Sequence, residues 1–592
     1  MLARFMKKYS RSVWFALGLV LAGYLPALAN ESSARNGLIG TGVECNPQEP
    51  LQGRETSTLY YYRSAAPGKS KTDEFEVAVY GGTPAGVTAA IQVARMGHKA
   101  VLISFDRHVG GMTSGGLTAT DVGNKESIGG LAQEFYRRIN RLLNFRASEA
   151  EELFLKMLAE AGVPVLFERA LAAVELKDGC LISATMETGE TIKAAFFIDA
   201  TYEGDLLAAA KVSYRVGREP ANAFDESLAG VWQQVSWKNI YQFCGLPLSP
   251  YFEAANPASG LLPEISAEAT GKPGEGDFKV QAYNFRMLLM DKPGKLPFSK
   301  PSGYDPKRYS LLARFLNASP DIHWALNYTT SPKADGPVQL RNGDCNNAGS
   351  FSSDYVGGNY RWPDGTYEAG SFAKLPSPRR GLPVPLHQLY ELRERIFQDH
   401  VNYQQGFMYF LANNLQVPEA LRTRVNRFGL DPHEFPNTGH WPHQLYVREG
   451  RRMVSDYVIT QANCESKTNV NDSVGLASYN MDSHFCQRVV VKEGGITTVR
   501  NEGAFGQKCP KPFPISYRAI VPKRDECHNL LVPVCLSASH VAYGSIRMEP
   551  VFMVLGQSAG AAACIAMDDA LPVQDVKYEK LQTRLLGDRQ RL

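Results

Sequence analysis

The chain has 592 residues, of which 44% are hydrophobic and 21% charged, a globular composition on a length too great for one simple core, so we expect two or three interlocked domains. The formal net charge of +3 comes from 63 Lys and Arg against 60 Asp and Glu. Without the four cations of the expected leader (Arg4, Lys7, Lys8 and Arg11), it becomes −1, which excludes a general electrostatic attraction to nucleic acid or an anionic membrane.

Residues 1–29 have the pattern of a secretory signal peptide. The four cations precede an apolar run over residues 13–25, and Ala27-Leu28-Ala29 offers an A-x-A cleavage site. That run is short, because a membrane-spanning helix needs about 20 apolar residues. We expect an exported protein, periplasmic or secreted, with no stable membrane insertion after cleavage. An uncleaved anchor is the alternative.

Residues 30–73 are rich in Ser, Gly, Pro and charge, lack an apolar period, and are expected to form a linker. From Glu74, the stretches "EFEVAVY", "GVTAAIQVARMG" and "HKAVLISF" predict a strand, a helix and a second, parallel strand. Residues 74–215 form the first part of this predicted α/β domain. They include an amphipathic helix over 128–143 and a hairpin that leads into a buried strand at 195–200.

Residues 216–500 differ in character, with more Pro, Asn, Trp and Tyr and long irregular stretches. We expect them to form a substrate domain inserted into the nucleotide fold, with one strongly helical segment from Leu386 to Val401. In the last part, residues 501–592, the early pattern returns: "NLLVPVCL" predicts a strand, and a helix follows with Pro550 near its first turn.

The turn between the first strand and the first helix contains Gly81, Gly82, Thr83 and Gly86. Glycine removes the Cβ that would keep a phosphate from the free N–H groups at a helix N-terminus, where the dipole adds positive charge. The pattern departs from G-x-G-x-x-G at Thr83, and the second strand ends at Ser104 instead of an acid, with Asp106 the nearest one. We interpret the turn as a pyrophosphate site, with Ser104 or Asp106 at the ribose. A purely structural turn is the alternative.

Five stretches carry a family resemblance: "GGTPAG", "RHVGGMTSGGLTATDVG", "IGGLAQEFY", "FIDATYEGDLLAAAKVSYRVGRE" and "LLVPVCLSASHVAYGSIRMEPVFMVLGQSAG". Together they resemble the secreted branch of the FAD-dependent oxidoreductase family, whose members are often labelled xanthan lyase-related. The similarity spans about residues 74–569. It implies an α/β fold with a Rossmann-like FAD-binding domain of the glutathione-reductase type, assembled from N- and C-terminal segments around a large inserted α+β substrate domain.

The same resemblance implies FAD as the cofactor and a set of residues around it. The glycines of the first turn would hold the pyrophosphate, a second glycine pair would let the chain pass close to the cofactor, and "DATYEGD" would line the far side of the site. For "DATYEGD", a strand exit and helix cap is the alternative. The residues so implied are Gly81, Gly82, Gly86, Gly110, Gly111, Asp199, Gly204 and Asp205.

The last helix carries a face of small residues between Gly556 and Ala562, against which a flat ring or a strand can pack. If its start, with Arg547 and Glu549, points at the pyrimidine edge of the flavin, the N–H groups and the helix dipole would stabilise reduced flavin. Tight packing on the sheet is the alternative.

Two histidines are candidates for moving a proton beside the flavin. In "YNMDSHFCQR", a strand would place Asp482, His484 and Cys486 on one face. His540 lies between the last strand and the last helix. Arg518, beside Tyr517, is a candidate for holding an anionic or hydroxylated substrate.

The sequence gives less support to metal binding or nucleophilic catalysis by a cysteine. Asp482, His484 and Cys486 lack a visible fourth metal ligand, and no neighbouring base is assured for a catalytic thiol at Cys486. The ten cysteines have no C-x-x-C spacing, so we expect no metal or iron–sulfur cluster. Disulfides are permitted in an oxidising compartment, but their pairing does not follow from the sequence.

We therefore expect an exported flavoenzyme that transfers a hydride between a small organic or carbohydrate substrate and flavin N5, with His484 or His540 taking the hydroxyl proton. Its electron acceptor is open, and no nucleic acid partner is expected. Trp324, Trp362 and Trp441 are candidate stacking faces for a sugar ring. The alternatives are a lyase or isomerase that uses flavin without net redox, and a carbohydrate-binding protein that has lost FAD.

Overall fold

The computed structural model describes residues 59–65, 68, 70–117, 120–142, 145–232, 240–318, 341–342, 351–358, 372 and 386–592. The expected signal peptide lies outside them, as do Trp324 and Trp362. The chain separates into a short unit, Met1–Glu55, and a large unit, Thr56–Leu592, to which all the described residues belong.

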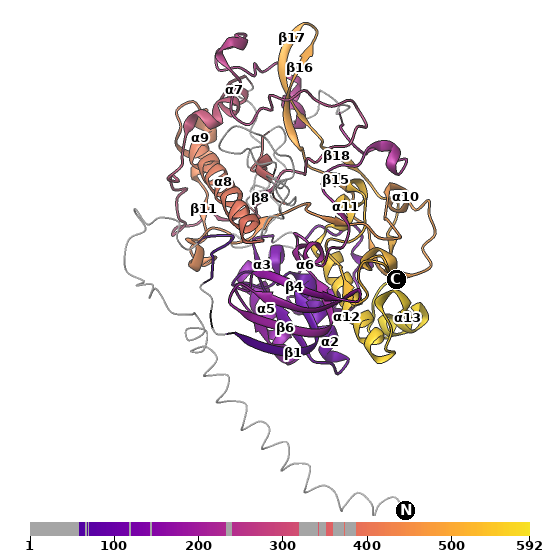
Figure 1. The fold of residues 1–592 in the computed structure, drawn as a ribbon. Coiled ribbons are helices and arrows are strands. Elements are labelled where there is room, and N and C mark those ends of the chain that lie inside the picture. Colours follow the sequence, from indigo (N-terminus) through magenta and orange to yellow (C-terminus); the bar gives the residue numbers. More distant parts are fainter. Residues whose placement is uncertain are drawn as a thin grey trace, which may run out of the picture. The chain divides into compact units, whose positions relative to one another are not determined.

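A seven-stranded sheet lies at the base of the large unit (Figure 1). Its strands are β1 (Lys71–Tyr80), β2 (Ala100–Ile103), β3 (Val165–Leu166), β4 (Leu171–Lys177), β5 (Cys180–Met186), β6 (Glu190–Asp199) and β20 (Leu530–Leu531). The order is β3-β2-β1-β6-β5-β4, and β20 pairs with β6. The β3-β2-β1-β6 part and β20 are parallel, whereas β4, β5 and β6 form an antiparallel meander.

The predicted strand–helix–strand unit is confirmed as β1, α2 (Pro84–Arg95) and β2, although β1 begins at Lys71, three residues before the expected start at Glu74. Residues 77–80 are buried on both faces of the sheet, as an uninterrupted apolar run in a parallel strand should be. The predicted hairpin is confirmed as β5 and β6.

The helices around the sheet come from both ends of the chain. They are α3 (Gly111–Ser114), α4 (Gly130–Arg138), α5 (Ala147–Glu160), α6 (Asp205–Ala209), α11 (His540–Ile546), α12 (Glu549–Asp568) and α13 (Tyr578–Gly587). The helix predicted over 128–143 is shorter as α4, because Asn140 adopts a left-handed conformation with φ of 60° just after its end.

Helix α12 packs along α2, although the two are separated by most of the chain (Figure 1). A Cβ on Gly556 would collide with the carbonyl oxygen of Ala85, and one on Gly560 would lie 2.5 Å from the carbonyl oxygen of Ala89. The small face of the last helix is therefore filled by the backbone of α2. The face is tightly packed, as the alternative in the sequence analysis expected, but its partner is helix α2 and not the sheet.

The portion between these segments contains α7 (Ser310–Ala318), α8 (Leu386–Asn413), α9 (Glu419–Asn426), α10 (Gln461–Cys464) and short strands. The strand pairs are β7 (Tyr214–Arg215) with β13 (Arg452–Met453), β8 (Asn284–Phe285) with β12 (Leu445–Tyr446), β14 (Ser473–Ala477) with β19 (Phe513–Ser516), β15 (Met481–Ser483) with β18 (Phe505–Gln507) and β16 (Gln487–Glu493) with β17 (Ile496–Glu502). A further sheet has β9 (Leu288–Met290) between β10 (Arg341–Asn342) and β11 (Gly429–Leu430). The helix predicted over 386–401 is confirmed and continues to Asn413.

The middle portion and the sheet portion share one hydrophobic core. A single buried cluster contains Val77 of β1, Phe285 of β8, Phe397 of α8 and Leu555 of α12. The expected boundary at residue 500 falls inside β17, and β14 and β19 pair across it. The chain segments are thus interlocked around a shared core.

Among the described residues, α12 is the one helix long and apolar enough to cross a membrane, with a mean hydropathy of 1.6. Of its most apolar window, 94% is buried inside the protein. Its apolar character is explained by its position in the core between α2 and the rest of the large unit.

We expect Gly560→Ala to lower the stability of the folded protein, although alanine favours a helix by about 1 kcal/mol over glycine. The new methyl group would meet backbone, which cannot rotate away, and such overpacking costs about 1–3 kcal/mol. Thermal unfolding measures the loss. Gly587→Ala is the matched control, because nothing lies within 4 Å of its Cβ position, and equal melting temperatures for the two variants would contradict the assigned packing.

Candidate active site

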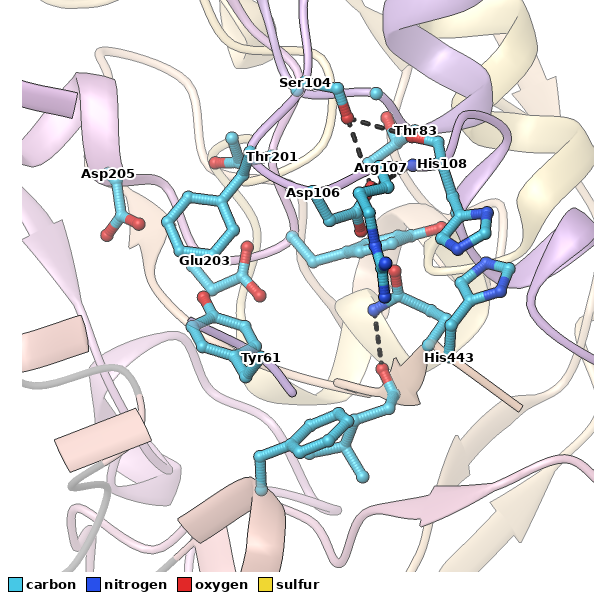
Figure 2. Close-up of a pocket in the computed structure, with 18 of the residues that line it drawn as sticks. Tyr61, Thr83, Ser104, Asp106, Arg107, His108, Thr201, Glu203, Asp205 and His443 are labelled. Carbon is cyan, nitrogen blue, oxygen red and sulfur yellow. Dashed lines mark hydrogen bonds between the residues drawn. The ribbon is translucent and has the colours of Figure 1, made fainter. Parts of the chain in front are cut away.

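A pocket lies where the parallel strands β1, β2 and β6 end (Figure 2). Its wall consists of three loops: residues 80–83 after β1, 104–108 after β2 and 201–205 after β6. The carboxyl edge of a parallel sheet is where doubly wound folds bind their ligands. Residues 60–61 and 438–445 complete the wall.

The first loop presents free backbone donors to the pocket. Thr83 caps α2, with its hydroxyl accepting from the Gly86 N–H (3.3 Å) and donating to the carbonyl of Ala200 (2.6 Å). Within the described part of the chain, the N–H groups of Gly82 and Thr83 have no hydrogen-bond partner. The helix N-terminus is thus open to an anion.

The glycines of this turn divide into two roles. Gly81 and Gly82 line the pocket. Gly81 has φ of 121°, a backbone conformation that residues with a side chain rarely adopt. Gly86 lies inside α2, where a Cβ would collide with the carbonyl oxygen of Gly81. Gly86 therefore allows the first turn of α2 to pack against the backbone at the end of β1, and it does not line the pocket.

The second loop is held by its own polar side chains. Ser104 lines the pocket, but its hydroxyl donates to the carbonyl of His108 (2.9 Å). The Asp106 carboxylate accepts from the N–H of His108 (2.7 Å) and lies 3.3 Å from the Ser104 hydroxyl. Both predicted ribose contacts thus border the pocket while they fix the loop.

The predicted second glycine pair, Gly110 and Gly111, follows directly. The Gly110 N–H donates to the carbonyl of Gly82 (2.6 Å), which ties this loop to the first one. Gly111 lines the pocket, and a Cβ there would collide with the hydroxyl of Tyr202. At these glycines the chain therefore lies close to Gly82 and Tyr202, and their closeness to the cofactor stays a prediction.

The Tyr202 hydroxyl links the pocket to the start of α12. It donates to the Glu549 carboxyl group (2.8 Å) and accepts from the N–H of Met112 (3.0 Å). Burial raises the pKa of Glu549 to about 8. At neutral pH this side chain is protonated, so the residue predicted near the flavin is a neutral hydrogen-bonding group in the folded chain.

In the third loop, the predicted residues of "DATYEGD" separate. Asp199 is fully buried and accepts from the N–H groups of Thr201 (3.0 Å) and Leu207 (2.8 Å), which is the strand-exit and capping role. Gly204 is the left-handed N-cap of α6, with φ of 70°. Neither lines the pocket, whereas Asp205 does.

Asp205 is the centre of a buried ion cluster. Its carboxylate accepts from Arg393 (2.6 and 2.9 Å) and from Arg451 (2.8 Å). Burial by itself raises the pKa of Asp205, but the two guanidinium groups outweigh it and lower the pKa below its ordinary value. The neighbouring Glu203 lines the pocket too, and burial raises its pKa to about 7.

Tyr60 and Tyr61, from the expected linker, close one side of the pocket. The N–H groups of Tyr61 and Tyr62 both donate to the Glu394 carboxylate (2.6 and 2.8 Å). The Tyr61 ring packs against Phe105, with 5.0 Å between centroids. The segment is ordered by these contacts, which a polar, aperiodic stretch gave no reason to expect.

The structure brings the two predicted histidines into one polar network. His484 Nδ1 contacts Asp354 (2.6 Å), and His484 Nε2 lies 3.4 Å from an Asp482 oxygen. His540 Nδ1 lies 2.9 Å from both oxygens of Glu449, and His540 Nε2 is 3.3 Å from the Ser483 hydroxyl. Ser483 is the last residue of β15, and His484 follows it, so both histidines lie at the end of this strand. The strand predicted to carry Asp482, His484 and Cys486 therefore stops before His484.

Arg547 joins this network to the start of α12. It donates to Asp482 (2.8 Å) and to the Tyr446 hydroxyl (2.7 Å), and it is two residues before Glu549. Arg518, in contrast, is not part of it: its guanidinium pairs with Asp472 (3.0 Å), and its side chain is 54% exposed. The sequence gave no sign of this difference.

The cysteine near His484 has neither of its alternative roles in the described residues. No group of three or more His, Cys, Asp or Glu side chains there is placed to hold a metal ion. Burial raises the pKa of the Cys486 thiol well above its ordinary value, so it is not an activated nucleophile.

The residues of the pocket fit the diphosphate of FAD. Two unpartnered amides at a helix N-terminus, a glycine with positive φ and an adjoining arginine, Arg107, supply donors and positive charge at one wall. Sequence reasoning did not single out Arg107, His108 and His443 as wall residues, nor Tyr202 and Glu203 within "DATYEGD". The pair "RH" lies in the loop after the second strand and was a usable signal, whereas His443 reaches the pocket from a distant segment.

Comparison with known proteins agrees with this reading. The family described as FAD dependent oxidoreductase matches residues 76–585. No curated protein sequence matches the chain.

Solved structures match over short parts. Thioredoxin reductase from T. acidophilum is 20% identical over 22% of this chain and 35% of its own, with a TM-score of 0.17. THI4 from Thermovibrio ammonificans is 19% identical over 26% of this chain and 71% of its own, with a TM-score of 0.21. The bacillithiol disulfide reductase from Staphylococcus aureus is 17% identical over 22% of this chain and 38% of its own, with a TM-score of 0.16. The chain thus spans little more than a third of the length of the two reductases, and no functional argument rests on these likenesses.

We expect Asp205→Asn to destabilise the protein by about 3–5 kcal/mol, because it leaves two buried guanidinium groups without their shared counter-charge. Denaturation in urea measures the change. Asp575→Asn is the control: Asp575 pairs with Arg524 on the surface, with side chains 43% and 54% exposed, so its loss should cost less than about 1 kcal/mol. Equal losses of stability in the two variants would show that Asp205 is not a buried counter-charge for Arg393 and Arg451.

We expect Glu549→Gln to flatten the pH dependence of stability in the cofactor-free protein. Below about pH 4.5 the side chain is protonated in both states; between there and about 8, only the unfolded chain ionises, so the free energy of unfolding falls as the pH rises. The fall is at most about 1.4 kcal/mol per pH unit.

Melting temperatures of wild type and variant at pH 5 and pH 8 test this effect. Glu579→Gln, at the exposed start of α13, should leave the wild-type dependence intact. A Glu549→Gln protein that loses as much stability as wild type over this range would exclude a buried, neutral Glu549.

Proposed function

The chain belongs to the FAD-dependent oxidoreductase family, with FAD as its cofactor, and on that premise we propose an exported enzyme that transfers a hydride between flavin N5 and a small organic or carbohydrate substrate. The family membership favours this function over a carbohydrate-binding protein that has lost FAD. The observation that carries the proposal is the His540–Glu449 pair, a buried histidine at the start of α11 that is oriented by a carboxylate.

Bound FAD supplies a two-electron acceptor for the substrate hydride. The chain has to hold the cofactor and remove the hydroxyl proton of the substrate. The first task belongs to the pocket at the sheet edge. It is connected to α12 through Tyr202 and Glu549, and α12 begins two residues after Arg547 of the histidine network.

His540 is suited to accept the proton. Burial alone would raise the pKa of Glu449, but His540 and Arg452 lower it below its ordinary value, so Glu449 is ionised. The ionised carboxylate accepts from Nδ1 of His540, which leaves Nε2 as the basic nitrogen, on the side of Ser483. Glu449 then stabilises the imidazolium that forms, as the acid does in other His–carboxylate pairs.

His484 is suited to a positioning role. Both of its ring nitrogens face carboxylates, Asp354 and Asp482, so the ring is held from two sides. The Asp354 carboxylate also accepts from Arg448 (2.8 Å). Because both nitrogens are engaged, His484 holds Asp482 and β15 in place beside His540.

Export rests on the signal-peptide pattern of residues 1–29. The carbohydrate class is supported by the composition of the middle portion. Trp441, the stacking candidate among the described residues, is 2% exposed and packs on Phe285, so it belongs to the core. That removes one reason for a sugar and leaves small hydroxy acids equally suited.

The absorption spectrum of the purified protein should show flavin bands, and anaerobic addition of an active sugar or hydroxy acid should bleach them. We expect His540→Asn to slow bleaching by about 10²–10⁴-fold, the usual contribution of a general base. His484→Gln should slow it less and leave the substrate dependence similar. His528→Asn is the control, because His528 contacts Cys180 instead of this network.

Bleaching at the wild-type rate by His540→Asn would remove His540 from the reaction. Conversion of substrate without oxygen uptake or dye reduction would favour the lyase or isomerase alternative, since those reactions involve no net redox. Failure of the protein to retain flavin at all would contradict the proposed function itself.

A further inference from the structure

Two histidines from distant segments are stacked in the pocket wall (Figure 2). The ring centroids of His108 and His443 are 3.7 Å apart, and the rings are 5° from parallel. His108 lies in the loop after β2, and His443 is two residues before the start of β12. Both line the pocket.

One nitrogen of each ring is buried without a hydrogen-bond partner among the described residues, and in both rings it is Nε2. His108 Nδ1 is engaged by the Glu151 carboxylate (3.0 Å). A buried polar atom left without a partner costs free energy, so native proteins rarely keep one unless a ligand or water completes it. Two such atoms, on stacked rings of residues that both line the pocket, indicate that a bound polar group completes them.

Side chains of both charges surround the pair, and the preference for an anion comes from the free amides of Gly82 and Thr83 in the adjoining loop. Glu151 from α5 faces His108, Asp106 and Arg107 lie in the same loop, and the ring of Phe435 packs on His443 (5.5 Å). Burial would lower the pKa of His108, but Glu151 outweighs it and holds the pKa above its ordinary value. Burial, with His108 and Arg107, lowers the pKa of His443 well below its ordinary value.

His108 is thus the ring of this stack that protonates more readily, and His443 is the one that protonates less readily. When His108 is protonated, its Nδ1–H donates to Glu151 and its Nε2–H is a second donor that needs an acceptor. Glu151 balances the charge of His108 from the side away from that nitrogen.

The pair shares its wall with the free amides of the first loop. The Cβ position of Gly82 is 2.9 Å from the carbonyl oxygen of His108, and the Gly110 N–H ties the loop to Gly82 (2.6 Å). We propose that His108 and His443 bind the negatively charged diphosphate of FAD together with the amides of Gly82 and Thr83. This inference rests on the flavin site at the sheet edge and adds two side chains to it.

A diphosphate beside the pair makes protonation of His443 more favourable, so FAD binding takes up a proton. Affinity is then greatest at low pH and falls as the pH rises through the pKa that His443 has in the complex. Glu203, across the pocket, ionises in the same range and also weakens anion binding, so the comparison of variants has to isolate the histidine.

The experiment titrates cofactor-free protein with FAD between pH 5.5 and 8.5 and follows the quenching of flavin fluorescence. The wild-type Kd should rise up to about tenfold per pH unit where one proton is taken up. His443→Gln and His108→Gln should bind about tenfold more weakly at pH 6, and His443→Gln should show a flatter profile. His433→Gln is the matched control: His433 is in the preceding segment, 71% exposed and paired with Asp431, and its loss should leave Kd unchanged at every pH.

Inorganic pyrophosphate gives a second test, because it should compete with FAD less effectively in His443→Gln than in wild type. Calorimetry of wild-type FAD binding in two buffers of different ionisation enthalpy needs no variant and should reveal proton uptake. Wild-type affinity in His443→Gln at each pH, or binding without proton uptake, would overturn the inference while the flavin enzyme stands. No FAD binding by wild type at any pH would overturn both.

Discussion

The relative position of the pocket and the histidine network depends on how closely the β1–α2 turn packs against neighbouring backbone. Gly86 lets the first turn of α2 lie directly against the carbonyl of Gly81, and Gly556 lets α12 lie against the carbonyl of Ala85. Neither contact tolerates a Cβ. Because both ends of the chain meet here, the open amides of α2 and the start of α12 are fixed relative to each other, and the pocket and the histidine network become parts of one assembly.

Buried charges make the same connection by a second means. Asp205, from the sheet portion, is neutralised by Arg393 of α8 and by Arg451, both from the middle portion. Glu449 of the middle portion likewise contacts His540 of α11 (2.9 Å). Since one unpaired buried charge costs several kcal/mol, these pairs favour a single register between the portions. The ion pairs that border the pocket and the network are therefore also what holds the middle portion in place.

The sequence was informative where a residue acts through its neighbours along the chain. The β1–α2–β2 unit follows from apolar period and turn glycines. Asp482 and His484 do lie 3.4 Å apart, but the strand expected to align them ends at Ser483. The sequence did not predict interactions in which the partner lies far away along the chain. Nothing local separates Asp205, held by two arginines, from Asp199, a loop cap, or marks Arg518 as a surface residue paired with Asp472. Tyr61 lies in a stretch without any period, and its order comes from Glu394 and Phe105.

Positive and negative groups are distributed unequally between the two sides of the pocket, and this distribution determines how a ligand can be oriented in it. On one side in Figure 2 are Thr83, His108 and His443, next to the free helix N-terminus. On the other are Glu203 and Asp205, the first with a raised pKa of about 7 and the second neutralised by arginines. An anion is favoured at the first side, whereas the second offers carboxyl groups that accept from, or when protonated donate to, hydroxyl groups. A ligand with a diphosphate beside a ribose matches both sides at once, and FAD has that order of groups.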